Sequence, residues 1–396
     1  MTRSITGLLS CACPLVFTAV LGCGDSSTGT AAPAGPGGAS ATSGGGGDHV
    51  GAAGNTTGSA GSDGSGGVNG QAGSNGSGGA NATGGAGSAV TDASTGSDAS
   101  PVVVSDGGSA NIKNVFIVLE ENHNWSQVSA LPYITHLQQI GAHSEQYWNP
   151  KGNHPSEPNY IWLEAAKNFC LTLPAPLCST NDDDATKNQV KGAVHLTKLL
   201  DAAGVSWMSY QEDMTAGQCP VSSGGGFQAK HDPFVFFDDV VGTPPSKTNA
   251  YCIAHHKPFS QFLPDLKAGN VARYNFITPN LDHDMHDGTP AAADAWLQLN
   301  IDPIVNSASP NHNAAVYSHS ALIVTWDEGS GGDGPIGMII ASPFAKVGYK
   351  DTKGADYYYT HSSMVLTMHK IFGVAGTAIG DAATAKDLSD LFTAFP

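Results

Sequence analysis

The sequence predicts an α/β fold, a doubly wound and mostly parallel sheet, preceded by a disordered linker. Short apolar runs alternate along residues 111–396 with segments whose apolar residues recur at helical spacing, and this alternation is typical of parallel strands joined by helices. Residues 24–110 are dominated by Gly, Ser, Ala, Thr and Asn. Such a segment has too little apolar surface to offset the entropy of ordering its backbone, so we expect a flexible tether.

Five apolar runs are short enough to be strands buried in a parallel sheet. They lie at 115–119, 205–210, 274–278, 322–326 and 338–341. Helical periodicity is found at 133–140, 196–203, 291–305 and 362–372. The roughly 285 residues after the linker are long enough for one sizeable core. We therefore predict a single domain over residues 111–396.

Export is predicted from residues 1–23. One basic residue, Arg3, precedes an apolar segment that is too short to span a membrane, in the order of a secretory signal peptide. The segment ends in Val20-Leu21-Gly22-Cys23, which resembles the bacterial lipobox, whose cysteine becomes lipidated. We expect an exported lipoprotein of the bacterial cell envelope or surface, anchored to a membrane through Cys23. The alternative is a plain signal peptide, which would release a secreted protein.

Cysteine number and net charge narrow the class of protein. The expected domain contains four cysteines, an even number in an exported chain, which predicts two disulfides. Three pairings are possible, and proximity favours Cys170 with Cys178 and Cys219 with Cys252. The formal charge of -17 argues against a nucleic-acid partner, because a surface that binds phosphate backbones is basic. It leaves a phosphate-bearing substrate open, since carboxylates can hold metal ions that supply positive charge.

Polar clusters follow three of the predicted strands at the point where each strand ends. They occupy residues 120–123, 282–287 and 327–328. The carboxyl ends of strands line the ligand crevice of an open α/β sheet, so we expect the clusters to converge. Asp, Glu, Asn and His suit Zn, Mn, Mg or Ca, and the spacing of Asp282 and His286 can place both on one ion. The sequence thus predicts one or two divalent metal ions without distinguishing among these elements.

Five motifs occur in the order found in one known family. They lie at 114–122, 154–160, 279–288, 325–328 and 359–363. They resemble those of the bacterial phosphoesterase family, which includes acid phosphatases and phosphatidylcholine-cleaving phospholipase C. That family is similar in fold to the alkaline phosphatase superfamily. The resemblance covers residues 111–374, and it implies an alkaline phosphatase-like fold and hydrolysis of phosphate esters.

The resemblance implies that Ser156 is the nucleophile. A serine hydroxyl reacts poorly at neutral pH, so a coordinated metal would activate it to attack phosphorus and form a phosphoserine that water hydrolyses. Pro155 and Pro158 indicate that Ser156 lies at the start of a helix, whose free amides suit a phosphate oxygen. From the sequence alone, a serine that only caps this helix is the alternative.

The resemblance also implies the metal ligands. Glu121 and Asn122 match the family's first pair of ligands, and Asp327 and Glu328 match a later pair; with Ser156 they would enclose one ion. Positions that hold a second ion in the wider superfamily are occupied by Asp282, His286 and His361. The alternative is a single ion, with these histidines contacting phosphate or protonating the leaving oxygen.

The remaining polar residues are expected to contact the substrate, to support the metal ligands or to have a structural role. His231 lies in a segment that resembles the family's Lys-His-Asn-Pro-Phe, which implies contact with the phosphate or leaving group and a catalytic set of Ser156, His231 and His286. Asp284 and Asp287 are expected to bind the metal or to support its ligands. The simplest interpretation of the next set is surface or structural histidines: His123, His154, His255, His256 and His369. The glycine-rich segment 329–334 is either a flexible rim or a tight strand connection.

Three functions are compatible with these patterns. We favour an acid phosphatase-like phosphomonoesterase, because the domain is compact and lacks the large C-terminal extension that phospholipases often carry. A phospholipase C-like phosphodiesterase remains open, since a lipid anchor would place the enzyme near lipid headgroups. A non-catalytic ligand-binding surface lipoprotein would not need Ser156. We expect a monomer whose partners are a small phosphate ester or lipid headgroup and, through the anchor, a membrane.

Overall fold

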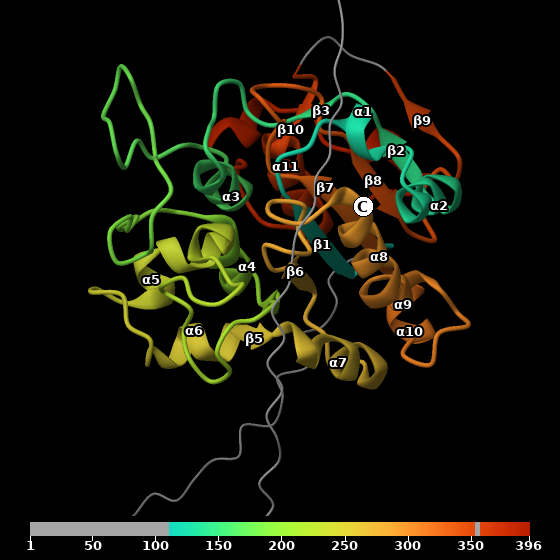
Figure 1. Cartoon of the computed structure of the whole chain (residues 1–396), viewed down its shortest axis with the longest axis horizontal. Coiled ribbons are helices and arrows are strands. Elements are labelled where there is room, and N and C mark those ends of the chain that lie inside the picture. The colour runs from blue at the N-terminus through green and yellow to red at the C-terminus, as the bar shows by residue number, and fades with distance from the viewer. Residues whose placement is uncertain (1–110, 353–356) are drawn as a thin grey trace, which may run out of the picture. The chain divides into compact units, whose positions relative to one another are not determined.

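The computed structural model describes residues 111–352 and 357–396 (Figure 1). The predicted signal peptide, the lipidation site Cys23 and the predicted linker 24–110 lie outside these residues. The domain boundaries therefore remain predictions. Within the described ranges, no helix is long and apolar enough to cross a membrane.

One eight-stranded sheet runs through the described part of the chain, in the order β5-β4-β6-β1-β7-β8-β2-β9. Its strands are β1 (Asn114–Glu120), β2 (Ala142–Ser144), β4 (Trp207–Gln211), β5 (His256–Pro258), β6 (Tyr274–Thr278), β7 (Ser320–Trp326), β8 (Met338–Ala341) and β9 (Lys350–Asp351). Two short strands pair separately, β3 (Tyr147–Trp148) and β10 (Tyr359–Thr360). All five predicted strands are present, and the predicted α/β class is confirmed.

The middle of the sheet is parallel. β1 pairs in parallel with β6 and β7, and β4 pairs in parallel with β5 and β6. The prediction of a parallel strand at Met338–Ala341 is wrong, because β8 runs antiparallel to both β7 and β2. Only residues 327–337, without a helix, connect β7 to β8. A parallel crossover needs a longer connection, usually a helix, whereas a loop suffices between antiparallel neighbours.

Helices lie on both faces of the sheet in Figure 1, with α3, α4 and α11 on one side and α2 and α7 to α10 on the other. The α-helices are α1 (Trp125–Val128), α2 (Pro132–Ile140), α3 (Ser156–Ala165), α4 (Leu196–Ala202), α5 (Asp238–Val241), α6 (Ala250–His255), α7 (Phe262–Ala268), α8 (Pro290–Asn300), α9 (Asp302–Val305), α10 (Ala314–Tyr317) and α11 (His361–Ile371). The 3-10 helices are η1 (Ala229–His231), η2 (Pro233–Phe236), η3 (Phe259–Gln261), η4 (Gly380–Thr384) and η5 (Ser389–Leu391). Because both faces are covered, β1, β6 and β7 are almost entirely buried, which explains their continuous apolar runs.

One predicted helix is broken in two. The segment 291–305 forms α8 and α9, which are separated at Ile301. Pro303 explains the break, because a proline has no amide hydrogen to continue the first helix and its ring clashes with the preceding turn. The helix expected after Pro155 is confirmed as α3, which begins at Ser156.

The two disulfides join Cys170 to Cys178 and Cys219 to Cys252. This is the pairing that proximity favoured among the three possible pairings. The first bond closes a loop that follows α3, and the second joins the segment after β4 to α6.

A buried ionic network holds the end of α3. Nδ1 of His195 lies 2.7 Å from Oε1 of Glu164 in α3, and its Nε2 lies 2.9 Å from Oδ1 of Asp239 in α5. The ring also stacks on Phe237 at 4.0 Å. Burial opposes a charge on His195, but the hydrogen bonds to Asp239 and Glu164 outweigh it and raise the pKa to about 9. The network thereby fixes the helix that carries Ser156 at its other end.

This network predicts a pH-dependent contribution to stability. Since the pKa of His195 in the fold is about 9 and its usual value is about 6.5, the contribution is complete below about pH 6.5 and is lost as pH rises through about 9. We expect His195→Gln to lower the free energy of unfolding by about 2–3 kcal/mol at pH 6 and by clearly less at pH 9.5, measured by urea denaturation. An equal loss at both pH values would contradict a charged His195.

Candidate active site

The polar clusters after β1, β6 and β7 meet at the carboxyl edge of the sheet. The parallel register aligns the ends of these three strands. Backbone hydrogen bonds then join the segments that follow: the amide of Glu121 donates to the carbonyl of Asp284 at 2.7 Å, and the amide of Asp327 donates to the carbonyl of Glu120 at 2.9 Å. The chain therefore holds three acidic segments, far apart in sequence, against one another.

Ser156 faces this cluster from the first turn of α3. Pro155 is the N-cap and Ser156 is the first helical residue, so the alternative of a serine that only caps the helix does not hold. The side chain is buried, and its hydroxyl donates to Oε2 of Glu121 at 2.9 Å. The sequence motif thus places the hydroxyl beside a carboxylate that follows β1.

The amide next to Ser156 is already bonded. The backbone N–H of Glu157 donates to Oδ1 of Asp182 at 2.9 Å, and the ammonium of Lys230 lies 2.8 Å from Oδ2 of the same carboxylate. The expectation of free amides at the start of α3 is therefore wrong for Glu157. An acidic side chain of the chain itself occupies that position.

The carboxylates around Ser156 are not balanced by enough positively charged neighbours. Both carboxylate oxygens of Asp327 are buried, and although the Ser156 hydroxyl and the backbone of Glu328 lie close enough to lower its pKa, neither makes a well-oriented hydrogen bond to them. Burial raises the pKa of Asp327, and the neighbouring charges of Glu121 and Glu328 raise it further. Burial likewise raises the pKa of Glu121. Glu328 is better satisfied, with Nδ2 of Asn122 at 2.5 Å from its Oε1. A cation among these oxygens would relieve both the burial and the repulsion.

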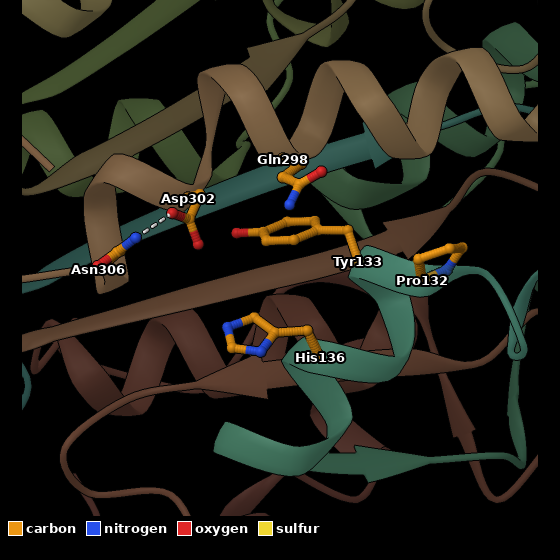
Figure 2. A pocket seen from close by; sticks show the side chains of 6 residues that line it. All are labelled: Pro132, Tyr133, His136, Gln298, Asp302 and Asn306. Atoms are coloured by element: carbon orange, nitrogen blue, oxygen red, sulfur yellow. Dashed lines mark hydrogen bonds between the residues drawn. The ribbon is translucent and has the colours of Figure 1, made fainter. Parts of the chain in front are cut away.

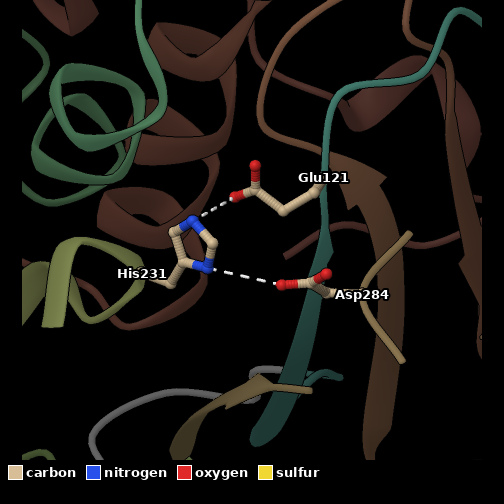
Figure 3. A group of neighbouring side chains, drawn as sticks. All are labelled: Glu121, His231 and Asp284. Carbon is tan, nitrogen blue, oxygen red and sulfur yellow. Dashed lines mark ion pairs between the residues drawn. The ribbon is translucent and has the colours of Figure 1, made fainter. Parts of the chain in front are cut away.

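Glu121 also belongs to a second group, with His231 and Asp284, whose ligand atoms lie within 4.8 Å of one another. Figure 3 shows the ring of His231 between the two carboxylates, with Nε2 3.0 Å from Glu121 and Nδ1 3.3 Å from Asp284. Nε2 of His231 and Oδ2 of Asp284 nevertheless make no well-oriented hydrogen bond with described residues. Burial lowers the pKa of His231 to about 4 and raises that of Asp284 to about 7.

Tyr160 supports both groups from α3. Its ring stacks on His231 with centroids 5.0 Å apart, and its hydroxyl donates to Oε1 of Glu121 at 2.8 Å. The residue that ends the sequence motif of Ser156 therefore orients the carboxylate shared by the two groups.

The structure does not bring Asp282, His286 and His361 together. Asp282 and His286 are exposed, and Nδ1 of His286 lies 2.7 Å from Asp287. The ring of His286 is 5.9 Å from that of His231, at the edge of the cluster. His361 is fully buried, with Nε2 2.6 Å from the carbonyl of Asp327 and Nδ1 3.1 Å from the hydroxyl of Tyr147. Its nitrogens are thus engaged in holding the end of β7.

Sequence reasoning underrated Asp284 and His154. Asp284 is fully buried whereas Asp282 is exposed, and Met285 between Asp284 and His286 has a positive φ of 78° that turns the backbone. No sequence pattern distinguishes two aspartates of one motif in this way. His154 contacts Glu328 and Asp333; its place just before Pro155 and Ser156 was the available indication.

A separate hollow of about 320 Å³ lies between α2 and the α8–α9 segment. Figure 2 shows its lining side chains, which are Pro132, Tyr133, His136, Gln298, Asp302 and Asn306. Its carboxylate, Asp302, already accepts a hydrogen bond from Asn306 at 2.7 Å. This hollow shares no residue with the carboxylate cluster, so we place the chemistry at the cluster.

The fold and the site define an α/β enzyme with its reactive groups at the carboxyl edge of the sheet. The chain belongs to the Phosphoesterase family, which matches residues 123–375. This match confirms the resemblance found in the sequence and the predicted class of enzyme, a phosphoric ester hydrolase.

Relatives of known name agree with this family. A phosphatidylinositol-3-phosphatase from Mycobacterium tuberculosis is 31% identical over 285 residues, which cover 70% of this chain and 82% of the relative. A probable acid phosphatase from Kluyveromyces lactis is 28% identical, over 67% of this chain and 59% of the relative. The phospholipase C A of M. tuberculosis is 30% identical over 33% of this chain and 23% of its own length. The chain therefore spans little more than half of the yeast relative.

Among solved structures, a Vibrio parahaemolyticus protein in the alkaline phosphatase superfamily matches this chain with a TM-score of 0.44 and 14% sequence identity, over 70% of each chain.

The crowding of carboxylates predicts a stability gain in the metal-free protein. Asp284→Asn keeps the oxygen that accepts a hydrogen bond from the amide of His286. The substitution removes a carboxyl group whose pKa is raised to about 7. Since the usual value is about 3.9, ionised Asp284 destabilises the fold increasingly from pH 4 to pH 7. We expect the variant, treated with chelator, to gain about 2 kcal/mol at pH 7.5 and nothing below about pH 4, measured by urea denaturation. The exposed Asp282→Asn is the matched control, and an equal gain there would contradict the assignment.

Proposed function

We propose that this chain is a metal-dependent hydrolase of phosphoric monoesters that works through a phosphoserine on Ser156. The single observation that carries the proposal is the contact of the Ser156 hydroxyl with Glu121, 2.9 Å apart, inside a group of buried carboxylates. The names of the relatives, a phosphatidylinositol-3-phosphatase and a probable acid phosphatase, support a monoester. The first name also makes a phosphorylated lipid headgroup a candidate substrate.

The donor set fits one or two divalent cations. Glu121, Asn122, Ser156, Asp327 and Glu328 would hold a first ion, and the buried oxygens of Asp327, which make no well-oriented hydrogen bond with described residues, support this assignment. Glu121, His231 and Asp284 would hold a second, with Glu121 shared. Carboxylate, amide and imidazole donors suit Mg, Mn, Ca or Zn. When bound, such ions lower the pKa of a coordinated hydroxyl and neutralise phosphate charge.

The residues of the chain supply the remaining steps. The hydrogen bond to Glu121 orients the Ser156 hydroxyl, which gives its proton to that carboxylate as its oxygen attacks phosphorus and the bond to the leaving oxygen breaks. The exposed imidazole of His286, at the edge of the site, would donate a proton to that leaving oxygen. A water molecule then attacks the phosphoserine and gives a proton to His286, and the departing Ser156 oxygen takes its proton back from Glu121. Each carboxylate is buried, so competing hydrogen bonds from bulk water are excluded.

Two other functions have weaker support. A phosphodiesterase of the phospholipase C kind is supported by the shorter match to the phospholipase of M. tuberculosis and by the lipid anchor predicted at Cys23. A non-catalytic binding lipoprotein is opposed by the assembly of Ser156, Glu121 and Asp327 in one place. We also propose export to the cell envelope and a monomeric state, on the sequence alone.

Substitution of the nucleophile gives the first test. Ser156→Ala removes the attacking oxygen but leaves four carboxylate and amide ligands, so we expect turnover to fall at least about 10³-fold with metal content within about twofold of wild type. Turnover by p-nitrophenyl phosphate hydrolysis and metal by elemental analysis are the two measurements. Near-normal turnover would remove Ser156 from the mechanism.

The substrate class has its own test. With p-nitrophenyl phosphate and bis(p-nitrophenyl) phosphate we expect the monoester to have at least about tenfold higher kcat/KM, and a chelator to abolish turnover until Mn²⁺, Mg²⁺, Ca²⁺ or Zn²⁺ is restored. Preference for the diester would favour the phospholipase-like function. Turnover that is insensitive to chelator would contradict the metal, and no turnover of either ester with any of these ions would favour the binding protein.

A further inference from the structure

His154 contacts the acidic cluster at Glu328. Its Nδ1 lies 2.5 Å from Oε2 of Glu328, which also accepts a hydrogen bond from Nδ2 of Asn159 at 3.1 Å. The other oxygen, Oε1, is bonded by Asn122. Glu328 is therefore held on both oxygens by residues that themselves belong to the site or to the motif around Ser156. The rotation of its carboxylate depends on His154 and Asn159.

The far side of the His154 ring contacts a second carboxylate. Nε2 lies 2.8 Å from Oδ1 of Asp333. Each ring nitrogen thus faces an oxygen, one from Glu328 and one from Asp333, so the ring is held at both ends although it is one-third exposed, at 33%. Without Asp333, an imidazole on the surface is free to rotate away from Glu328.

Asp333 is itself fixed by three donors from two segments of the chain. It accepts hydrogen bonds from Nδ2 of Asn149 at 3.2 Å, from the amide of Gly152 at 2.9 Å and from the hydroxyl of Tyr357 at 2.6 Å. No role in the proposed chemistry requires so many donors on one partly exposed carboxylate. They give Asp333 a defined position from which it can hold His154.

The glycine-rich segment that carries Asp333 packs tightly at its two ends. A Cβ at Gly329 or Gly334 would lie 2.6 Å or 2.4 Å from Oδ1 of Asn124, and Gly332 has a φ of 125°. Of the two alternatives for residues 329–334, the structure favours a tight strand connection, which places Asp333 beside His154.

We propose that His154 is a positioning residue for the metal ligand Glu328 and that Asp333 acts through His154. The inference rests on the proposed function, because it assigns Glu328 to a bound ion. Because His154 is held between two carboxylates, it orients the Glu328 carboxylate toward the ion. Loss of such supporting contacts generally weakens metal binding about 10- to 100-fold. The conformation of the glycine-rich segment 329–334, which places Asp333 beside His154, thereby affects the affinity of the site for metal.

A double-mutant cycle tests this coupling in the full chain. The dissociation constant for Mn²⁺ is measured by isothermal titration calorimetry for wild type, His154→Ala, Asp333→Asn and the double variant. We expect His154→Ala to weaken Mn²⁺ binding about 10- to 100-fold and Asp333→Asn to weaken it in the wild-type background but not in the His154→Ala background. His154→Asn, which can keep a donor near Glu328, should restore part of the affinity.

His283→Gln is the matched control, because His283 is similarly exposed, at 37%, and lies 2.9 Å from Glu212 outside this relay; its Mn²⁺ affinity should equal that of wild type. Thermal unfolding of each variant without metal reports whether it folds. Unchanged affinity in His154→Ala, or an equal effect of Asp333→Asn in both backgrounds, would overturn the relay alone. Absence of Mn²⁺ binding by the wild type would overturn the metal site and the relay together.

Discussion

Burial of like charges at the carboxyl edge of the sheet is the constraint on which the site depends. Glu120, Glu121, Asp284 and Asp327 are all fully buried there. Removing carboxylates from water raises their free energy, and each one raises the pKa of its neighbours. The surrounding fold must therefore supply enough stability to hold them together, which it does through parallel strands buried on both faces. Destabilising groups concentrated in one place are a common property of functional sites.

Glu121 links the two groups of candidate ligands. One of its oxygens accepts the Ser156 hydroxyl, and the other accepts the Tyr160 hydroxyl and lies near His231. A change at any of these partners therefore alters both groups. Ser156 and Tyr160 lie on the same helix, α3, so the orientation of that helix affects the position of the Glu121 carboxylate, and its anchorage at Glu164 bears on the opposite end of the helix.

Local patterns in the sequence were sufficient for much of the fold, but contacts between distant residues were not. The five strand positions and α3 follow from apolar runs and from Pro155, which are properties of neighbouring residues. The direction of β8 is set by the length of the helix-free connection 327–337 rather than by the apolar run of the strand itself. Similarly, Asp282 is exposed and Asp284 is buried although both belong to one motif, and the burial of His361 depends on Tyr147, 214 residues away.

The carboxylate of Asp182 has a consequence for the order of events at the site. It takes both the amide that follows Ser156 and the ammonium of Lys230, two donors that would otherwise attract a phosphate. The described residues alone thus present a negative potential to an anionic substrate, and in the proposed mechanism the attraction comes from captured cations. Under that proposal assembly is sequential: the site becomes receptive to phosphate only after it has bound metal, so the supply of metal in the surroundings determines whether the enzyme acts.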